Sequence, residues 1–271
     1  MPELPEVETV LRTLEKQIKD QKIKNVEVRW SNTIAHPSVS EFTTRLSNQH
    51  FRDFDRLGKY LIFRLDEQVL IVHLRMEGKF YLEPIDVPIR KHTHVIFELD
   101  NGQSLRYNDT RKFGKMYLYH QDEALKALAK VGLDPWDKEL ISTYLLNKIR
   151  NRHIPLKQML LDQSIIAGIG NIYADEICFA CAMSPLKKVD TLTEDDCQQL
   201  IDNTKAILAS AITAGGTTIR SYTSSLGISG RFQLSLNVHT KKDQLCHRCQ
   251  STIIKTKVAG RGTYYCPGCQ K

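Results

Sequence analysis

What this sequence lacks narrows the classes of protein to which it can belong. It has no apolar run near the roughly 18 residues of a membrane-spanning helix, and no basic-then-apolar secretory signal at its start. It also has no low-complexity block and no internal repeat. Of its 271 residues, 41% are hydrophobic and 25% are charged. We therefore expect a globular protein of the cytoplasm, long enough for more than one domain.

Disulfides are also not expected, although the chain has seven cysteines. The odd number and the missing export signal favour reduced thiols or metal ligation. Four of them form two Cys-x-x-Cys pairs separated by 16 residues, at Cys246, Cys249, Cys266 and Cys269. Two such pairs at the ends of a hairpin offer four thiolates in a tetrahedron, which suits zinc. The spacing predicts a zinc ribbon with one closed, structural ion, and His247 is a less favoured alternative ligand because four thiols already fit.

The third Cys-x-x-Cys pair, Cys178 and Cys181, has no second pair nearby and lies in a helical pattern. Free cysteine packs as a small apolar residue, so we interpret this pair and Cys197 as parts of a core. A redox or metal role is the alternative.

Positive charge is concentrated at one end of the chain. Residues 237–271 contain seven Lys or Arg and a single acid, Asp243, which accounts for +6 of the net charge of +7. A basic tail on a nearly neutral body indicates a polyanionic partner such as nucleic acid. A solvated charged surface would have the same composition.

Hydrophobic periodicity predicts an α+β multidomain fold. Residues 6–20 place Val7, Val10, Leu11, Leu14 and Ile18 on one helical stripe. From 22 to 119 the period changes to two, which predicts a β-sandwich or barrel. The expected strands lie within 22–30, 58–65, 68–76, 78–84, 93–100 and 104–109, with the last two joined by a hairpin at Asn101-Gly102.

After residue 120 the pattern is helical, with Thr193 and Asp196 spaced as a capping box. The candidate helices span 121–130, 138–150, 154–164, 171–182 and 193–214. The expected domains are a β-sandwich over 2–118, a connector over 119–134, a helical domain over 135–224, a loop and linker over 215–236, and the zinc ribbon over 237–271.

The two residues that follow Met1 carry groups that could take part in a reaction. If Met1 is removed, Pro2 carries a secondary amine, which forms a cationic iminium on attacking a sugar carbon. Glu3 follows directly and could transfer a proton in the same small volume. A disordered chain start is the alternative interpretation of this dipeptide.

Six motifs, in their order and spacing, identify the sequence as a member of the bacterial formamidopyrimidine-DNA glycosylase family. They are PELPEVETV, LGKYLIF, HLRMEG, DTRKFG, AGIGNIYADE and GRGTYYCPGCQ, and they extend over essentially the whole chain. The resemblance implies a bifunctional DNA glycosylase and AP lyase of base excision repair. Its substrates would be 8-oxoguanine and formamidopyrimidines in double-stranded DNA, and the enzyme would be a monomer associated with the nucleoid. Thr110 stands where the family often has Pro.

The resemblance also implies catalytic roles. Pro2 would attack C1′ and expel the base, while Glu3 would protonate the sugar ring oxygen. Lys59 would assist β-elimination, and Arg261 of the ribbon would assist δ-elimination. An exposed strand-end lysine is the alternative interpretation of Lys59.

DNA contacts follow from the same resemblance. Met76, Arg111 and Phe113 would fill the hole left by the extruded base, which recovers part of the stacking energy lost on extrusion. The residues expected to contact backbone phosphates are His73, His92, Arg152, Lys157 and Asn171. Asn171 is also expected to cap a helix of a helix–two-turn–helix domain. His94 is expected to face inward.

The loop TTIRSYTSSLGISG would cover the extruded base and read the lesion. Its candidate lesion-binding residues are Thr217, Ile219, Arg220, Ser221 and Tyr222. Two other functions remain open. A relative of endonuclease VIII would prefer oxidised pyrimidines, and a zinc-ribbon DNA-binding protein without catalysis would leave Pro2, Glu3 and Lys59 unexplained.

Overall fold

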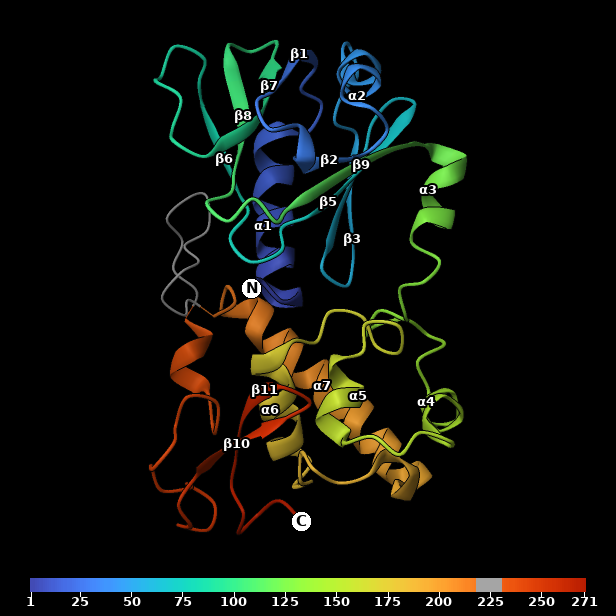
Figure 1. Ribbon diagram of the computed structural model, residues 1–271, viewed down its shortest axis with the longest axis vertical. Helices are drawn as coiled ribbons and strands as arrows, with labels where there is room; N and C mark the ends of the chain where they lie inside the picture. The colour runs from blue at the N-terminus through green and yellow to red at the C-terminus, as the bar shows by residue number, and fades with distance from the viewer. Residues whose placement is uncertain (218–230) are drawn as a thin grey trace. The chain divides into compact units, whose positions relative to one another are not determined.

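The computed structural model describes residues 1–217 and 231–271 (Figure 1). Contacts among these residues divide the chain into two compact units. The first contains Met1–Lys130 together with Thr217, and the second contains Val131–Gly216 and Arg231–Lys271. Among the described residues, no helix has the length and apolar character required to cross a bilayer.

The first unit is the predicted β-sandwich. Its four-stranded sheet has the order β1-β7-β8-β6, and its five-stranded sheet has the order β2-β9-β5-β4-β3. The first sheet is built from β1 (Ile23–Val28), β6 (Lys79–Pro84), β7 (Thr93–Leu99) and β8 (Gln103–Asn108). The second is built from β2 (Ile34–His36), β3 (Asp53–Leu57), β4 (Tyr60–Arg64), β5 (Gln68–His73) and β9 (Lys115–His120). The predicted hairpin joins β7 to β8, with Gly102 at a φ of 80°.

Helix α1 (Leu4–Ile18) shares the core of this sandwich. The predicted stripe is buried, and its five apolar residues join one cluster with side chains from both sheets. The helix begins two residues earlier than the periodicity predicted, because Glu3 serves as its N-cap and forms a capping box with Glu6. The N-terminus of the chain is therefore fixed to a buried helix.

Several elements of the first unit were not predicted. Helix α2 (Val39–Leu46) interrupts the strands, and the strands β2, β3 and β9 were not named. The signal for α2 was present, because Ser38 and Glu41 form a capping box. The strand β3 has a polar sequence, Asp53–Leu57, and it lies at an edge of its sheet, where burial does not impose alternation.

The helices expected after residue 120 are all present. Helix α3 (Gln121–Ala127) ends the first unit, and the second contains α4 (Ser142–Ile149), α5 (Leu156–Leu161), α6 (Asn171–Ala180) and α7 (Glu194–Thr213). The capping box of Thr193 and Asp196 begins α7. Short 3-10 turns lie at Ser31–Thr33, Val189–Thr191 and Phe232–Ser235.

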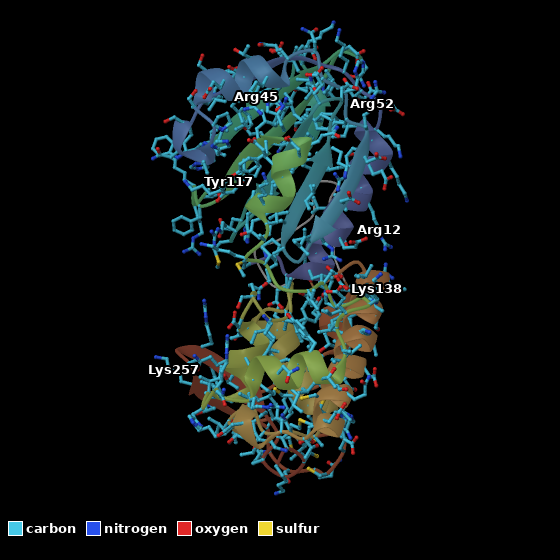
Figure 2. All side chains as sticks on the ribbon, turned by 90° about the vertical axis from the view of Figure 1, so that its right-hand side faces the viewer. Arg12, Arg45, Arg52, Tyr117, Lys138 and Lys257 are labelled. Atoms are coloured by element: carbon cyan, nitrogen blue, oxygen red, sulfur yellow. The ribbon has the colours of Figure 1, made fainter. Side chains whose placement is uncertain are left out.

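The C-terminal hairpin consists of β10 (Ile254–Val258) and β11 (Arg261–Tyr265), as the ribbon spacing predicted. It packs on α6 within the second unit, where Phe179 joins the small core of the ribbon. The Lys257 side chain of β10 is exposed and extends away from the fold (Figure 2). The three remaining cysteines, Cys178, Cys181 and Cys197, are buried in helices or directly after one, in agreement with a packing role.

Candidate active site and metal centre

The start of the chain is an ordered structure. Pro2 and Glu3 are both buried, and Glu3 is 3% exposed. The Glu3 amide donates to Oε2 of Glu6 at 2.8 Å. The other oxygen of Glu6 accepts the amide of Thr217 at 2.7 Å and its hydroxyl at 3.0 Å. One carboxylate therefore links the predicted nucleophile and acid to the first residue of the predicted lesion loop.

Lys59 directly precedes β4, and His73 is the last residue of β5, the strand paired with β4. Lys59 is 5% exposed, at the turn between β3 and β4, and its neighbour Tyr60 is in register with His73. Burial lowers the pKa of His73 to about 3, and the positive charges of Arg75 and Lys59 add to this effect. The Arg75 amide donates to Nδ1 of His73 at 3.0 Å. The neutral ring therefore carries its proton on Nε2, which suits a donor to a phosphate oxygen.

The structure brings Arg111 and Phe113 together on one turn. Phe113 is 50% exposed, and the Arg111 guanidinium lies 4.9 Å from the centre of its ring. Met76 is half-buried on the turn that follows β5. An exposed aromatic ring beside a planar cation offers flat groups of the kind that can enter a base stack.

Asp109 holds this turn in place. Its fully buried carboxylate accepts three backbone amides at 2.8–3.0 Å, those of Arg111, Phe113 and Gly114. The expectation that His94 faces inward is confirmed, because it is 5% exposed and its Nε2 lies 2.7 Å from the Asp109 carbonyl. His92 has a φ of 68° and is half-buried.

In the second unit, two predicted phosphate contacts meet at one atom of the ribbon. The carbonyl oxygen of Gly262 accepts Nζ of Lys157 at 2.9 Å and Nδ2 of Asn171 at 3.1 Å. Gly262 directly follows Arg261, whose side chain is exposed. Lys157 and Asn171 therefore fix the backbone next to Arg261.

This geometry corrects one expectation. The N-cap of α6 is Gly170, and Asn171 is the first helical residue with its amide directed to the ribbon. Lys157 is fully buried and paired with Asp175 at 2.7 Å, so its ammonium group is shielded from solvent. A lysine is buried this deeply only when its charge is compensated, and here Asp175 provides that charge.

Arg152 and Arg261 line the same groove of the second unit, which has a volume of about 560 Å³. The Arg152 guanidinium donates to Asp162 at 2.8 Å and is 40% exposed. The Asp162 carboxylate lines the groove as well, so the pair with Arg152 offsets part of the positive charge there.

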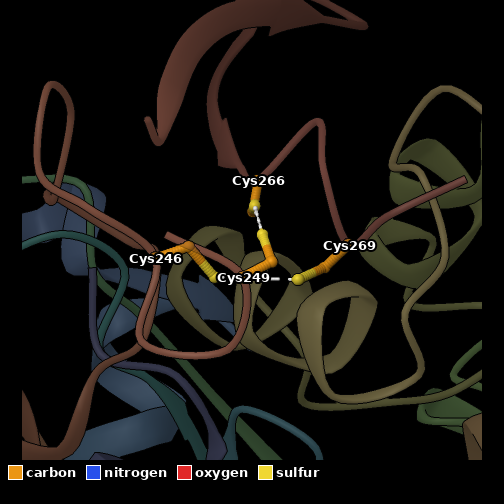
Figure 3. Close-up of side chains that lie close together, drawn as sticks. All are labelled: Cys246, Cys249, Cys266 and Cys269. Atoms are coloured by element: carbon orange, nitrogen blue, oxygen red, sulfur yellow. Dashed lines mark hydrogen bonds between the residues drawn. The ribbon is translucent and has the colours of Figure 1, made fainter. Parts of the chain in front are cut away.

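The four predicted metal ligands converge (Figure 3). All four sulfur atoms lie within 4.8 Å of one another. The Cys246–Cys269 pair is separated by 3.7 Å and the Cys249–Cys266 pair by 3.4 Å. Four sulfurs placed 2.3 Å from a central zinc ion at tetrahedral angles would lie about 3.8 Å apart, so the residues fit the ion.

The two residues between Cys246 and Cys249 contact helix α6. The ring of His247 contacts that of Phe179 at 5.4 Å, which gives this histidine a packing role outside the ligand set. The Arg248 guanidinium lies 4.2 Å from the centre of the same ring and donates to the Phe179 carbonyl at 2.8 Å. The zinc centre thereby couples the ribbon to the helical core.

Of the predicted lesion loop, Thr217 is placed as described above. Ile219, Arg220, Ser221 and Tyr222 lie outside the described residues. Sequence reasoning missed Glu6 and Asp109. The Glu3-x-x-Glu6 spacing of a capping box could have indicated the first, whereas the role of Asp109 depends on the path of the turn.

Comparison with known proteins finds one family along the chain. Three family models match the chain: the formamidopyrimidine-DNA glycosylase N-terminal domain over residues 1–116, its H2TH domain over 131–223, and the zinc finger found in FPG and IleRS over 243–271. A formamidopyrimidine-DNA glycosylase of Oceanobacillus iheyensis is 46% identical and covers 100% of this chain and 98% of its own. The enzyme of Bacillus subtilis is 43% identical, covering 100% of this chain and 99% of its own.

Solved structures show the same similarity. A Lactococcus lactis FPG mutant bound to DNA containing Fapy-dG has a TM-score of 0.94 and 39% identity, with full coverage of both chains. The Lactococcus lactis protein bound to DNA with an abasic site has a TM-score of 0.93 and 39% identity over 99% of each chain. A further complex of that protein contains DNA with an oxidised pyrimidine.

Proposed function

Because this chain belongs to the formamidopyrimidine-DNA glycosylase family, we propose that Pro2 is its nucleophile and Glu3 its acid. The protein is a DNA glycosylase of base excision repair with an AP lyase activity, and it holds one structural zinc ion. The observation that carries the proposal is the buried, capped chain start, in which Glu6 holds the Glu3 backbone and Thr217 together. Such a fixed position is what an attacking amine requires.

The reaction begins once Met1 has been removed. The Pro2 nitrogen attacks C1′, the glycosidic bond breaks, and the base leaves with the bonding electrons and with the proton that the Pro2 nitrogen gives up. Glu3 protonates the ring oxygen, which opens the sugar and leaves a cationic iminium. Loss of a C2′ proton then expels the 3′ phosphate, and a second elimination expels the 5′ phosphate.

The remaining predicted residues have supporting roles in this proposal. Lys59 and the Nε2–H group of His73 act on phosphates beside the reacting sugar, and His92 binds the backbone further along the strand. Arg261 and Arg152 provide positive charge from the second unit, and Asn171 fixes the backbone beside Arg261. Lys157 is a positioning residue, because its ammonium group forms an ion pair with Asp175.

The expected domain organisation completes the proposal. The sandwich over 2–118 carries the chemistry, the helical domain over 135–224 and the ribbon over 237–271 hold the duplex, and the loop over 215–236 covers the extruded base. Met76, Arg111 and Phe113 enter the vacated space. The protein acts as a monomer on bacterial DNA, and hence at the nucleoid in the cytoplasm.

Substrate choice is tested on two duplexes that differ in a single base. One contains 8-oxoguanine opposite cytosine, and the other contains an oxidised pyrimidine such as 5-hydroxycytosine. We expect base release followed by β,δ-elimination on both, with faster release of the purine. The pyrimidine is included because the related Lactococcus lactis enzyme has been crystallised with such DNA. Faster release of the pyrimidine would favour an activity like that of endonuclease VIII, and binding without release of either base would leave only a DNA-binding protein.

A further inference from the structure

Two turns of the first unit carry the side chains proposed above to fill the space left by the extruded base. The turn over 74–78 carries Met76, and the turn over 109–114 carries Arg111 and Phe113. Each turn ends in a glycine, Gly78 or Gly114. Neither glycine has a positive φ, so the backbone conformation does not require glycine at either position.

What requires glycine is the space beside Tyr107. A Cβ atom on Gly114 would lie 1.6 Å from the Tyr107 hydroxyl oxygen, and one on Gly78 would lie 2.3 Å from the same atom. Both distances are far below van der Waals contact, so any side chain would displace the turn or the tyrosine. The two turns therefore meet at a single hydroxyl group.

Tyr107 is itself fixed by the sheet. It is fully buried on β8, where it pairs with Phe80 of β6 and Val95 of β7. Its ring centre lies 5.3 Å from that of Phe80, and its hydroxyl lies 3.5 Å from Oδ2 of Asp109. The same carboxylate oxygen accepts the Gly114 amide at 2.8 Å.

We propose that Tyr107 is a positioning residue that holds the two turns in one fixed arrangement, so that Met76, Arg111 and Phe113 enter the base stack together. This proposal rests on the proposed function, because the three side chains matter only if a base is extruded. Insertion recovers stacking energy only when the inserted groups fill the space in a defined geometry. A buried hydroxyl wedged between two glycine backbones supplies that geometry.

The test uses three variants of the full-length, zinc-loaded protein. Gly114→Ala places a methyl group on the hydroxyl oxygen, and we expect excision of 8-oxoguanine from a duplex to fall by about tenfold or more. Tyr107→Phe removes that oxygen and should lower the same rate several-fold. The double variant should recover part of the loss of Gly114→Ala, because the 1.6 Å overlap is gone while the ring carbon Cζ, at 2.8 Å, remains close.

A second substrate separates this role from general damage to the enzyme. A single-stranded oligonucleotide with an abasic site has no base stack to fill, so all three variants should cleave it at the wild-type rate. Tyr144→Phe is the matched control, because it removes a phenol hydrogen bond of 3.1 Å to Ile165 in the other unit. It should leave both rates unchanged.

The outcomes are distinguishable. Wild-type rates on the duplex for Gly114→Ala and Tyr107→Phe would overturn the proposal and leave the proposed function intact. Equal losses on both substrates, without recovery in the double variant, would overturn it in favour of a role in stability alone. A wild-type protein that cleaves neither substrate would overturn the proposed function, and this proposal with it.

Discussion

The Glu6 carboxylate binds Thr217, which lies 211 residues further along the chain, through both its amide and its hydroxyl group. The same carboxylate caps α1 by accepting the Glu3 amide. Glu6 is 5% exposed, so these hydrogen bonds form away from water, where their loss is costly. The position of the chain start therefore depends on an acidic residue that sequence reasoning left without a role.

Replacement of this carboxylate should weaken both stability and activity. Glu6→Gln turns an acceptor oxygen into an amide donor that faces an N–H group. We expect a loss of about 1–3 kcal/mol in the free energy of unfolding and slower base excision. Urea unfolding and single-turnover kinetics measure the two effects. Glu15→Gln on the same helix is the control, since its pair with Lys19 is exposed and should contribute little.

Replacement of Arg261 should change which products form. We expect Arg261→Gln to release the base but to accumulate the β-elimination product in place of the β,δ product, since the charge that assists the second step is lost. Denaturing gels resolve the two products. Lys257→Gln makes the same charge change on the partner strand of the ribbon and should keep the wild-type ratio. The same ratio of β to β,δ product in the two variants would show that Arg261 does not assist the second elimination.

The ring of His73 should remain neutral throughout the physiological range. Its pKa is lowered to about 3, below the ordinary value of 6.5, so the unfolded chain binds the proton more readily. The contribution of His73 to the free energy of unfolding is therefore at its full value above pH 6.5. It falls as the pH is lowered from 6.5 to about 3, by at most about 1.4 kcal/mol per pH unit. Proton–nitrogen NMR of the ring should show no titration between pH 5 and pH 8. A midpoint near 6.5 would contradict the buried environment.

Removal of zinc should unfold the ribbon. Structural zinc supplies folding free energy, and four adjacent sulfurs without an ion do not form a stable centre. We expect one zinc ion per chain by atomic emission, and a loss of both zinc and duplex affinity in Cys266→Ser. Cys181→Ala should keep its zinc, because this thiol lies beside Gln199 and outside the cluster. Full duplex affinity in a zinc-free protein would contradict the role of the ribbon.

The sequence predicted the fold where periodicity or spacing is strong. The α1 stripe, the central strands, the hairpin at Asn101-Gly102 and the four ligand cysteines are all present. It failed at β3, a polar edge strand, and at α2, a helix of only two turns. The local preferences of β3 are weak compared with tertiary packing, whereas α2 carries a capping box that could have indicated it.

Contacts between distant residues could not be predicted from sequence. Lys157 and Asn171 bind the carbonyl of Gly262, about 100 and 90 residues away, a contact that no spacing along the chain indicates. The packing of Gly78 and Gly114 on Tyr107 depends on the sheet register. Spacing along the chain predicts residues that act as neighbours, whereas these relationships arise only from tertiary structure.

Borohydride trapping tests the central claim most directly. The protein is incubated with an 8-oxoguanine:cytosine duplex, reduced, and the cross-linked residue is located by mass spectrometry, with intact mass establishing that Met1 is absent. We predict a covalent adduct on the nitrogen of Pro2 and loss of the adduct when Met1 is retained. An adduct on a lysine side chain such as Lys59, or no adduct while duplex binding is intact, would contradict the assignment of Pro2 as the nucleophile.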